Sequence, residues 1–165
     1  MDALKHHVYG FVFFFCVFYI NSMNSNFPEE VRQKRFPRSS QSLNDIFLFL
    51  ANCLSNQMVS SDASYKILFA VEEIFTNIVK YNATGTTEIL LKFSTNGREA
   101  CIQLIDEDSP YFDPTSRPEP DLTKPIEQKK PGGLGIYLVK ELLDGFEYQH
   151  DQRTSTTTLR QQLRS

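Results

Sequence analysis

A long apolar helix near the middle of the chain constrains the fold more than any other feature. Hydrophobic side chains recur with almost no polar face through a segment that we expect to begin near Ser61 or Asp62 and to end near Asn82. They are Ile67, Leu68, Phe69, Ala70, Val71, Ile74, Phe75, Ile78 and Val79. A helix that is apolar nearly all round is normally buried. The sequence therefore predicts that this helix lies inside the protein.

Length and composition indicate a single globular domain. The chain has 165 residues, of which 41% are hydrophobic and 22% charged, so it can bury a real core but has no room for a second folded unit. Its net charge of -3 lacks the basic excess that binding to a nucleic-acid backbone requires. Its three cysteines, Cys16, Cys53 and Cys101, are widely spaced with no histidine pair nearby. This spacing suggests neither a disulfide framework nor a zinc site and favours a reducing compartment.

Shorter elements are predicted on both sides of the central helix. A basic edge strand at residues 30–38 contains Pro37, and serines then precede an amphipathic helix at residues 43–54. Two strands, at residues 86–94 and 99–105, are joined by an Asn-Gly step typical of hairpin turns. The last elements are a helix and two strands, expected at residues 136–143, 146–150 and 154–163.

The segment from residue 106 to residue 133 is predicted to be a long loop. Six prolines, at positions 110, 114, 118, 120, 125 and 131, prevent regular structure there. Ordered domains rarely carry so long a loop without a function, and a lid over an active site is one such function.

The first 22 residues differ from the rest of the chain. Residues 8–20 are almost unbroken apolar and aromatic, and Lys5 precedes them, as in a secretory signal. However, no small-residue cleavage site follows, and a membrane span needs about 20 apolar residues. Three interpretations stay open: a signal peptide, a membrane anchor, or translated sequence upstream of a true start at Met23. The last one predicts a cytoplasmic protein whose domain occupies residues 23–165.

Glu73 and Asn77 form a polar pair on the central helix. They are four residues apart in the sequence and therefore only about 40° apart around the helix axis. Burying a carboxylate and an amide is costly unless a metal, a ligand or a hydrogen-bond network satisfies them. The alternative is that both lie at the solvent edge of the helix. Glu72, about 100° away, is the more solvated acid in either case.

Three later features could also contact a ligand. Asp106 stands where a strand ends, although acidic residues before a proline are also ordinary turn formers. The run from Gly132 to Gly135 opens a helix, whose free amides attract phosphate, and two lysines precede it. The threonines at 154–158 fit a strand with polar faces.

Taken in order, these motifs resemble the ATP-binding boxes of the GHKL superfamily, the histidine-kinase-like ATPases. The segments VEEIFTNIVKYN, DEDSPYFDP and GGLGIYLVKELLD are similar to those of its small anti-sigma-factor serine/threonine-protein kinases, over about residues 30 to 163. The resemblance implies the Bergerat fold, an α/β two-layer sandwich with helices on one face of a mixed, mostly antiparallel sheet. It implies ATP and Mg²⁺ as cofactors.

The resemblance also implies roles for individual residues. Asn77 would be the Mg²⁺ ligand, and Glu73 the general base that accepts the proton of an attacking hydroxyl. Asp106 would bind the adenine amino group, and Thr158 would touch the adenine side of the pocket.

The glycine-opened helix would hold the phosphates. Gly133, Leu134 and Gly135 would contact the nucleotide, the two glycines through their amides. Lys129 or Lys130 could neutralise the γ-phosphate as the lid closes.

One departure from the family pattern concerns the first glycine box, which usually is Asp-x-Gly. Here Asp108 follows Asp106 in place of the glycine. A second alignment with the family motif takes the Phe-Asp-Pro segment at residues 112–114 as its reference. It puts Glu107 at the position that binds adenine and Ser109 at the position of the glycine. We prefer Asp106 because the apolar alternation of the preceding strand ends there.

Two functional classes follow from the resemblance. The first is a kinase that phosphorylates a small antagonist protein and, in its other state, holds a sigma factor. The second is a nucleotide-binding interaction module of the same fold, without useful catalysis. A homodimer is also implied, with the N-terminal strand and the first helix as candidate surfaces.

Overall fold

The computed structural model describes residues 30–109 and 134–164. The apolar segment at residues 1–22 and most of the expected loop, residues 110–133, lie outside the described residues, and so do the interpretations placed on them. The elements are β1 (Glu30–Phe36), a 3-10 turn η1 (Ser40–Ser42), α2 (Leu43–Leu54), α3 (Ser61–Tyr81), β2 (Ile89–Thr95), β3 (Glu99–Asp106), α4 (Leu134–Leu142), β4 (Gly145–Asp151) and β5 (Thr154–Gln162).

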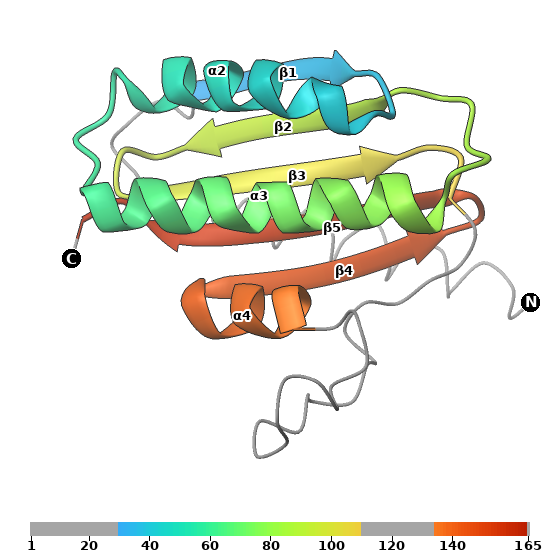
Figure 1. The fold of residues 1–165 in the computed structure, drawn as a ribbon. Helices are drawn as coiled ribbons and strands as arrows, with labels where there is room; N and C mark the ends of the chain where they lie inside the picture. The colour runs from blue at the N-terminus through green and yellow to red at the C-terminus, as the bar shows by residue number, and fades with distance from the viewer. Residues whose placement is uncertain (1–29, 110–133, 165) are drawn as a thin grey trace, which may run out of the picture.

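The strands form one five-stranded sheet in the order β1-β2-β3-β5-β4. Each pairing between neighbouring described strands is antiparallel. The helices α2, α3 and α4 cover one face of this sheet, as Figure 1 shows, with α3 over its centre. The predicted α/β two-layer sandwich is therefore confirmed.

Strict alternation in the central strands produces the core. Every second residue of β2 and β3 is buried, including Ile89, Leu91 and Phe93 on β2. These side chains meet buried residues of the helices, such as Leu50 on α2 and Phe75 on α3, both 0% exposed. Side chains of successive strand residues point to opposite faces, so the other half of each strand faces away from the helices.

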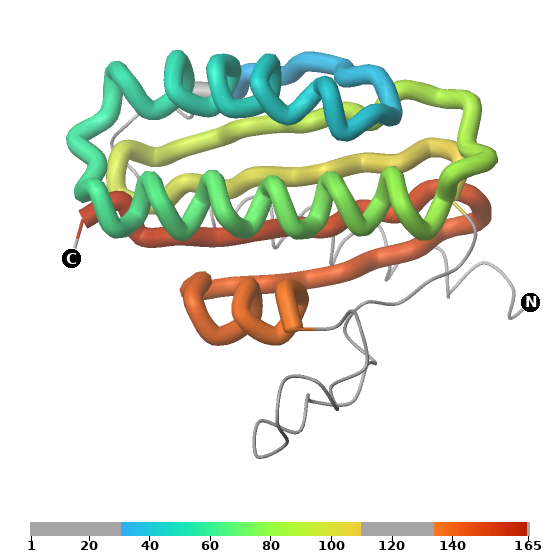
Figure 2. The backbone as a smooth tube through the Cα atoms, in the orientation of Figure 1, coloured from blue at the N-terminus to red at the C-terminus, as the bar shows by residue number. Residues whose placement is uncertain are grey.

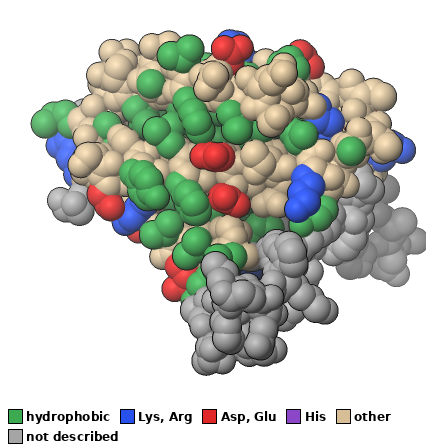
Figure 3. All heavy atoms as spheres, in the orientation of Figure 1, with side chains coloured by type: hydrophobic (Ala, Val, Ile, Leu, Met, Phe, Trp, Pro, Cys, Tyr) green, Lys and Arg blue, Asp and Glu red, His purple; other side chains and the backbone are tan. Residues whose placement is uncertain are grey.

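Helix α3 is buried on one face only, which corrects the expectation that it lies inside the protein. Val71 and Phe75 are 0% exposed, whereas Phe69 and Ile78 are only partly buried and Tyr65 is 64% exposed. A two-layer fold covers one side of each helix and leaves the other side to solvent. Figure 3 shows the result, with hydrophobic and acidic side chains interspersed over the helical face.

The predicted element types are found, and the boundaries differ by a few residues for identifiable reasons. Helix α3 begins after Ser60, whose hydroxyl oxygen accepts a 3.1 Å bond from the amide of Ala63. Strand β2 begins at Ile89 rather than at residue 86, because Thr86 turns its amide and hydroxyl to the carboxylate of Asp108.

The hairpin turn between β2 and β3 is as predicted. Gly97 has φ of +81°, which suits a glycine, and Asn96 accepts bonds from the amides of Arg98 and Glu99. The end of the chain returns to this side of the molecule, as Figure 2 shows. There the Leu163 amide donates to the Arg98 carbonyl, and the Leu163 carbonyl accepts from Ser60.

Within residues 30–109 and 134–164, none of the helices has the length and apolar character that a bilayer span requires.

Candidate functional site

A cavity of about 40 Å³ lies between α3, the end of β3, α4 and the last two strands. The cavity is lined by three isoleucines, Ile74, Ile78 and Ile136, and by a larger set of side chains with polar atoms. The polar side chains are Asn77, Tyr81, Asn82, Asp106, Ser109, Tyr148, Ser155 and Thr157. Two of the predicted site residues, Asn77 and Asp106, therefore share one cavity although they belong to different elements.

Asn77 and Glu73 lie on the same side of α3, as the helical spacing predicts. Asn77 donates from Nδ2 to the backbone carbonyl of Glu73 at 2.7 Å. This bond uses the amide nitrogen and leaves the oxygen Oδ1 as the atom that can face a cation. Both residues are half-buried, while Glu72 is exposed as expected.

The Glu73 carboxylate lies against the start of α4. A Cβ added to Gly135 would be 2.6 Å from Cδ of Glu73 and 3.3 Å from its Cγ, so no side chain fits at position 135 without displacing the acid. Burial raises the pKa of Glu73 above its usual range, and the neighbouring charge of Glu72 raises it further. The carboxylate is thereby a stronger base than an exposed glutamate.

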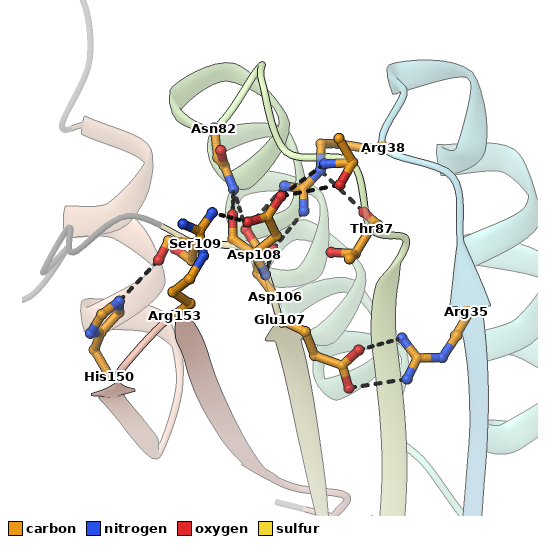
Figure 4. A network of polar contacts seen from close by, with 11 residues as sticks. Arg35, Arg38, Asn82, Thr87, Asp106, Glu107, Asp108, Ser109, His150 and Arg153 are labelled. Atoms are coloured by element: carbon orange, nitrogen blue, oxygen red, sulfur yellow. Dashed lines mark hydrogen bonds and ion pairs between the residues drawn. The ribbon is translucent and has the colours of Figure 1, made fainter.

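Asp106 ends β3 as a fully buried carboxylate held by four donors. Its Oδ1 accepts from Arg38 Nη2 at 2.5 Å and from the Asp108 amide at 3.1 Å. Its Oδ2 accepts from Arg38 Nη1 and from Asn82 Nδ2, each at 3.0 Å. Figure 4 shows how these groups converge from three separate segments. Burial alone would raise the pKa of Asp106, but the bonds from Arg38, Asn82 and the amide outweigh it and lower this pKa.

The two neighbouring acids lie in different surroundings. Glu107 is exposed and forms a two-bond pair with Arg35, with both distances at 3.0 Å. Asp108 accepts from the amide and hydroxyl of Thr86 and pairs with Arg153. Between Asp106 and Glu107, only Asp106 lines the cavity.

Asp108 occupies the position at which the family pattern has glycine. Among the described non-glycine residues, only Gln152 has a positive φ, so the backbone at Asp108 does not require glycine. The side chain is held at the surface by Thr86 and Arg153 and not in the cavity lining.

The residues predicted to contact the phosphates are not among those that line the cavity, or lie outside the described residues. Leu134 is 41% exposed at the start of α4, and neither it nor Gly135 lines the cavity, whereas the next residue, Ile136, does. Lys129, Lys130 and Gly133 lie outside the described residues.

Thr158 does not line the cavity; its neighbour Thr157 does. Successive strand residues face opposite sides of the sheet, and the Thr158 hydroxyl accepts a 3.4 Å bond from Gln103.

A family model for the histidine kinase-like ATPase domain matches residues 36–161. The chain belongs to this family.

The curated relatives of this ATPase domain carry kinase names. Serine-protein kinase RsbW of Bacillus cereus is 24% identical over 124 residues, covering 73% of this chain and 78% of the relative. RsbW of Bacillus mycoides is 26% identical over 124 residues, with the same coverage. Serine/threonine-protein kinase BtrW of Bordetella bronchiseptica is 24% identical over 117 residues, covering 70% and 82%. These names agree with the anti-sigma-factor kinase group that the three motifs indicate.

A solved structure shares the fold of this ATPase domain. It contains the RsbU and RsbW domains of a Mycobacterium tuberculosis protein and aligns with a TM-score of 0.58 at 14% identity. The alignment covers 81% of this chain but only 32% of that larger chain. The likeness shows the fold alone.

The oxygen atoms at the cavity fit a magnesium ion that is held mainly by water and by phosphate oxygens of a substrate. Magnesium usually keeps several waters and binds through one or two protein oxygens plus substrate phosphates. Asn77 lines the cavity with its Oδ1 not used by the bond to Glu73, so it would supply one such oxygen. Among residues 30–109 and 134–164, no group of three or more histidine, cysteine or acidic side chains could hold a metal by itself.

Sequence reasoning missed two residues of the site in this ATPase domain, Arg38 and Asn82. Arg38 follows Pro37 at the end of the edge strand and contacts Asp106, which is 68 residues further along the chain. Asn82 is the C-cap of α3 and donates to Asp106 and to the Asp108 carbonyl. The only local signal was that a basic residue and an amide each stand at the end of an expected element.

Proposed function

We propose that this chain is an ATP-dependent protein serine/threonine kinase that phosphorylates a hydroxyl of a small antagonist protein and sequesters a sigma factor. The observation that carries the proposal is the Glu73–Asn77 pair. It places a carboxylate of raised pKa one helical turn from an amide oxygen at the cavity. The kinase names of the relatives support the same reaction class.

In the proposed reaction, Asn77 would hold Mg²⁺ through Oδ1, and Glu73 would be the general base for the incoming hydroxyl. Glu73 accepts the proton as the hydroxyl oxygen bonds to the γ-phosphorus, and the bond to the β–γ bridging oxygen breaks, leaving ADP. The bound metal would neutralise the phosphate charge. Phosphoryl transfer depends mainly on positioning and charge, so two groups fixed on one rigid helix suit it.

The base of the nucleotide would lie toward Asp106, at the other end of the cavity. The amides at the start of α4, with the lysines before it, are proposed to hold the phosphates. The same surroundings would serve a nucleotide-dependent interaction module that does not transfer phosphate. That alternative is favoured by one observation: Asn77 lines the cavity, whereas the assigned base, Glu73, is not among the lining residues.

A labelled-phosphate assay with ATP, magnesium and the antagonist encoded with the chain tests the proposal. The native chain should transfer phosphate, and Glu73→Ala should lower the rate by about 10²–10⁴-fold while ATP still binds, because only the proton acceptor is lost. Glu72→Ala is the matched control on the same helix and should stay close to the native rate.

Transfer that survives in Glu73→Ala would contradict the assigned base. ATP binding without any transfer by the native chain would favour the interaction module.

A further inference from the structure

The Asp106 carboxylate has no acceptor position left for a ligand. An ionised carboxylate offers about four lone-pair sites, two on each oxygen. Oδ1 accepts from Arg38 Nη2 and the Asp108 amide, and Oδ2 accepts from Arg38 Nη1 and Asn82 Nδ2. A hydrogen bond from the amino group of a base therefore requires one of these donors to leave.

The Arg38 side chain is buried and fixed in this site. Its side chain is 7% exposed, and its Nε donates to the Thr87 carbonyl at 3.3 Å. A Cβ added to Gly85 would lie 2.7 Å from Cζ of Arg38 and 2.8 Å from Nδ2 of Asn82, so the glycine gives both donors their room. The guanidinium is thus held in the geometry that fills two acceptor sites at once.

We propose that Arg38 competes with the amino group of the nucleotide base for the Asp106 carboxylate, and so sets the affinity and the base selectivity of the pocket. This inference rests on the nucleotide binding proposed above. Of the two side chains that donate to Asp106, Arg38 makes two bonds and Asn82 one. Releasing Arg38 therefore frees the most acceptor capacity.

Arg38→Lys in the full chain separates charge from geometry. A lysine keeps the positive charge that the buried carboxylate needs, but its ammonium is a point donor without the planar fork of arginine. At least one acceptor site on Asp106 should become available. The matched control is Arg35→Lys, which alters the same kind of two-bond pair with Glu107, where the side chains are 44% and 42% exposed.

The readout is the affinity, by calorimetry with magnesium, for ATP and for inosine triphosphate. The second nucleotide has a carbonyl where adenine has its amino group, so it cannot donate to Asp106. Arg38→Lys should tighten ATP binding by about fivefold, the effect of one added hydrogen bond, and leave inosine triphosphate unchanged. Arg35→Lys should change neither affinity.

Asn82→Ala is the second variant, should the lysine variant fail to fold. It frees one site on Oδ2 while the Arg38 pair stays, and it should raise the ratio of ATP to inosine triphosphate affinity. The inference is overturned if the ratio of ATP affinity to inosine triphosphate affinity does not rise in the variants that fold. Equal changes in both affinities, or weaker ATP binding, would each be such a result. The kinase proposal would then stay in place. If neither the native chain nor any variant binds nucleotide, both proposals fail.

Discussion

Asp106 and Arg38 form an ion pair almost wholly removed from solvent, with side chains 1% and 7% exposed. A buried charge is tolerated only when its partner and its hydrogen bonds are present. The same pair links the end of β1 to the end of β3, so it contributes to stability as well as to the cavity.

Replacing one partner should therefore be costly. Asp106→Asn leaves the Arg38 charge buried without its partner, and we expect the free energy of unfolding to fall by about 3–5 kcal/mol in urea denaturation. Asp151→Asn, which removes an exposed acid, is the control and should change it by less than about 0.5 kcal/mol.

The same pair predicts a dependence on pH. The folded-state pKa of Asp106 lies below its usual value, so its stabilising contribution is present above an ordinary aspartate pKa of about 4. The contribution is lost as pH falls through the lower, folded-state pKa. Unfolding of the native chain should become easier over this acid range, and Asp106→Asn should show a weaker dependence there. An equal dependence in both would contradict the assignment.

At this scale, sequence could name Asp106, Glu73 and Asn77 as candidates, because each stands in a recognisable local pattern. It could not name Arg38 or Asn82 as partners of Asp106, since those contacts bridge 68 and 24 residues of chain. The sequence also could not tell whether Thr157 or Thr158 faces the cavity. The face on which each residue of β5 lies depends on the register of this strand with β3.

Two helices meet where Gly135 of α4 faces Glu73 of α3, and this contact is a condition for the proposed reaction. Gly135→Ala would place a methyl group where the Glu73 carboxylate now lies. We expect a loss of transfer of about 100-fold, because a displacement of about 1 Å can cost that much. The free energy of unfolding should change little, because the higher helix propensity of alanine, about 1 kcal/mol, offsets the cost of displacing the Glu73 side chain.

Leu138→Ala tests whether any change on α4 has the same effect. Leu138 is 36% exposed on this helix and does not line the cavity, so transfer should stay close to the native rate. Equal losses in the two variants would show that the helix as a whole, and not the contact with Glu73, is responsible.

Element types were predictable because their periods differ: the apolar spacing marked the helices, and alternation marked β2 and β3. Burial of α3 was overestimated, because hydrophobicity alone does not tell whether a helix has one covered side or two. The start of β2 was placed too early, since the interaction of Thr86 with Asp108 is made between segments 22 residues apart.

Residues 30–109 and 134–164 share one hydrophobic core, to which α2, α3, α4 and the sheet contribute. Phe75 is 0% exposed within it, and Phe75→Ala should lower the free energy of unfolding by about 3–5 kcal/mol. Domains are stable by only about 5–15 kcal/mol, so this variant should unfold at a much lower urea concentration. Tyr65→Ala, on the same helix but 64% exposed, should cost less than about 1 kcal/mol.

The turn at Asn96 and Gly97 lies at the opposite end of β3 from Asp106. Strand β3 has 8 residues, so its two ends are about 23 Å apart and the turn lies beyond the end far from that carboxylate. Arg98 is exposed there, so Arg98→Cys would offer a thiol for a dye or a solid support once Cys16 and the half-buried Cys101 are replaced by serine, while Cys53 stays buried. Immobilised in this way, the molecule would keep its cavity turned toward free solution, ready for single-molecule observation of nucleotides arriving and leaving.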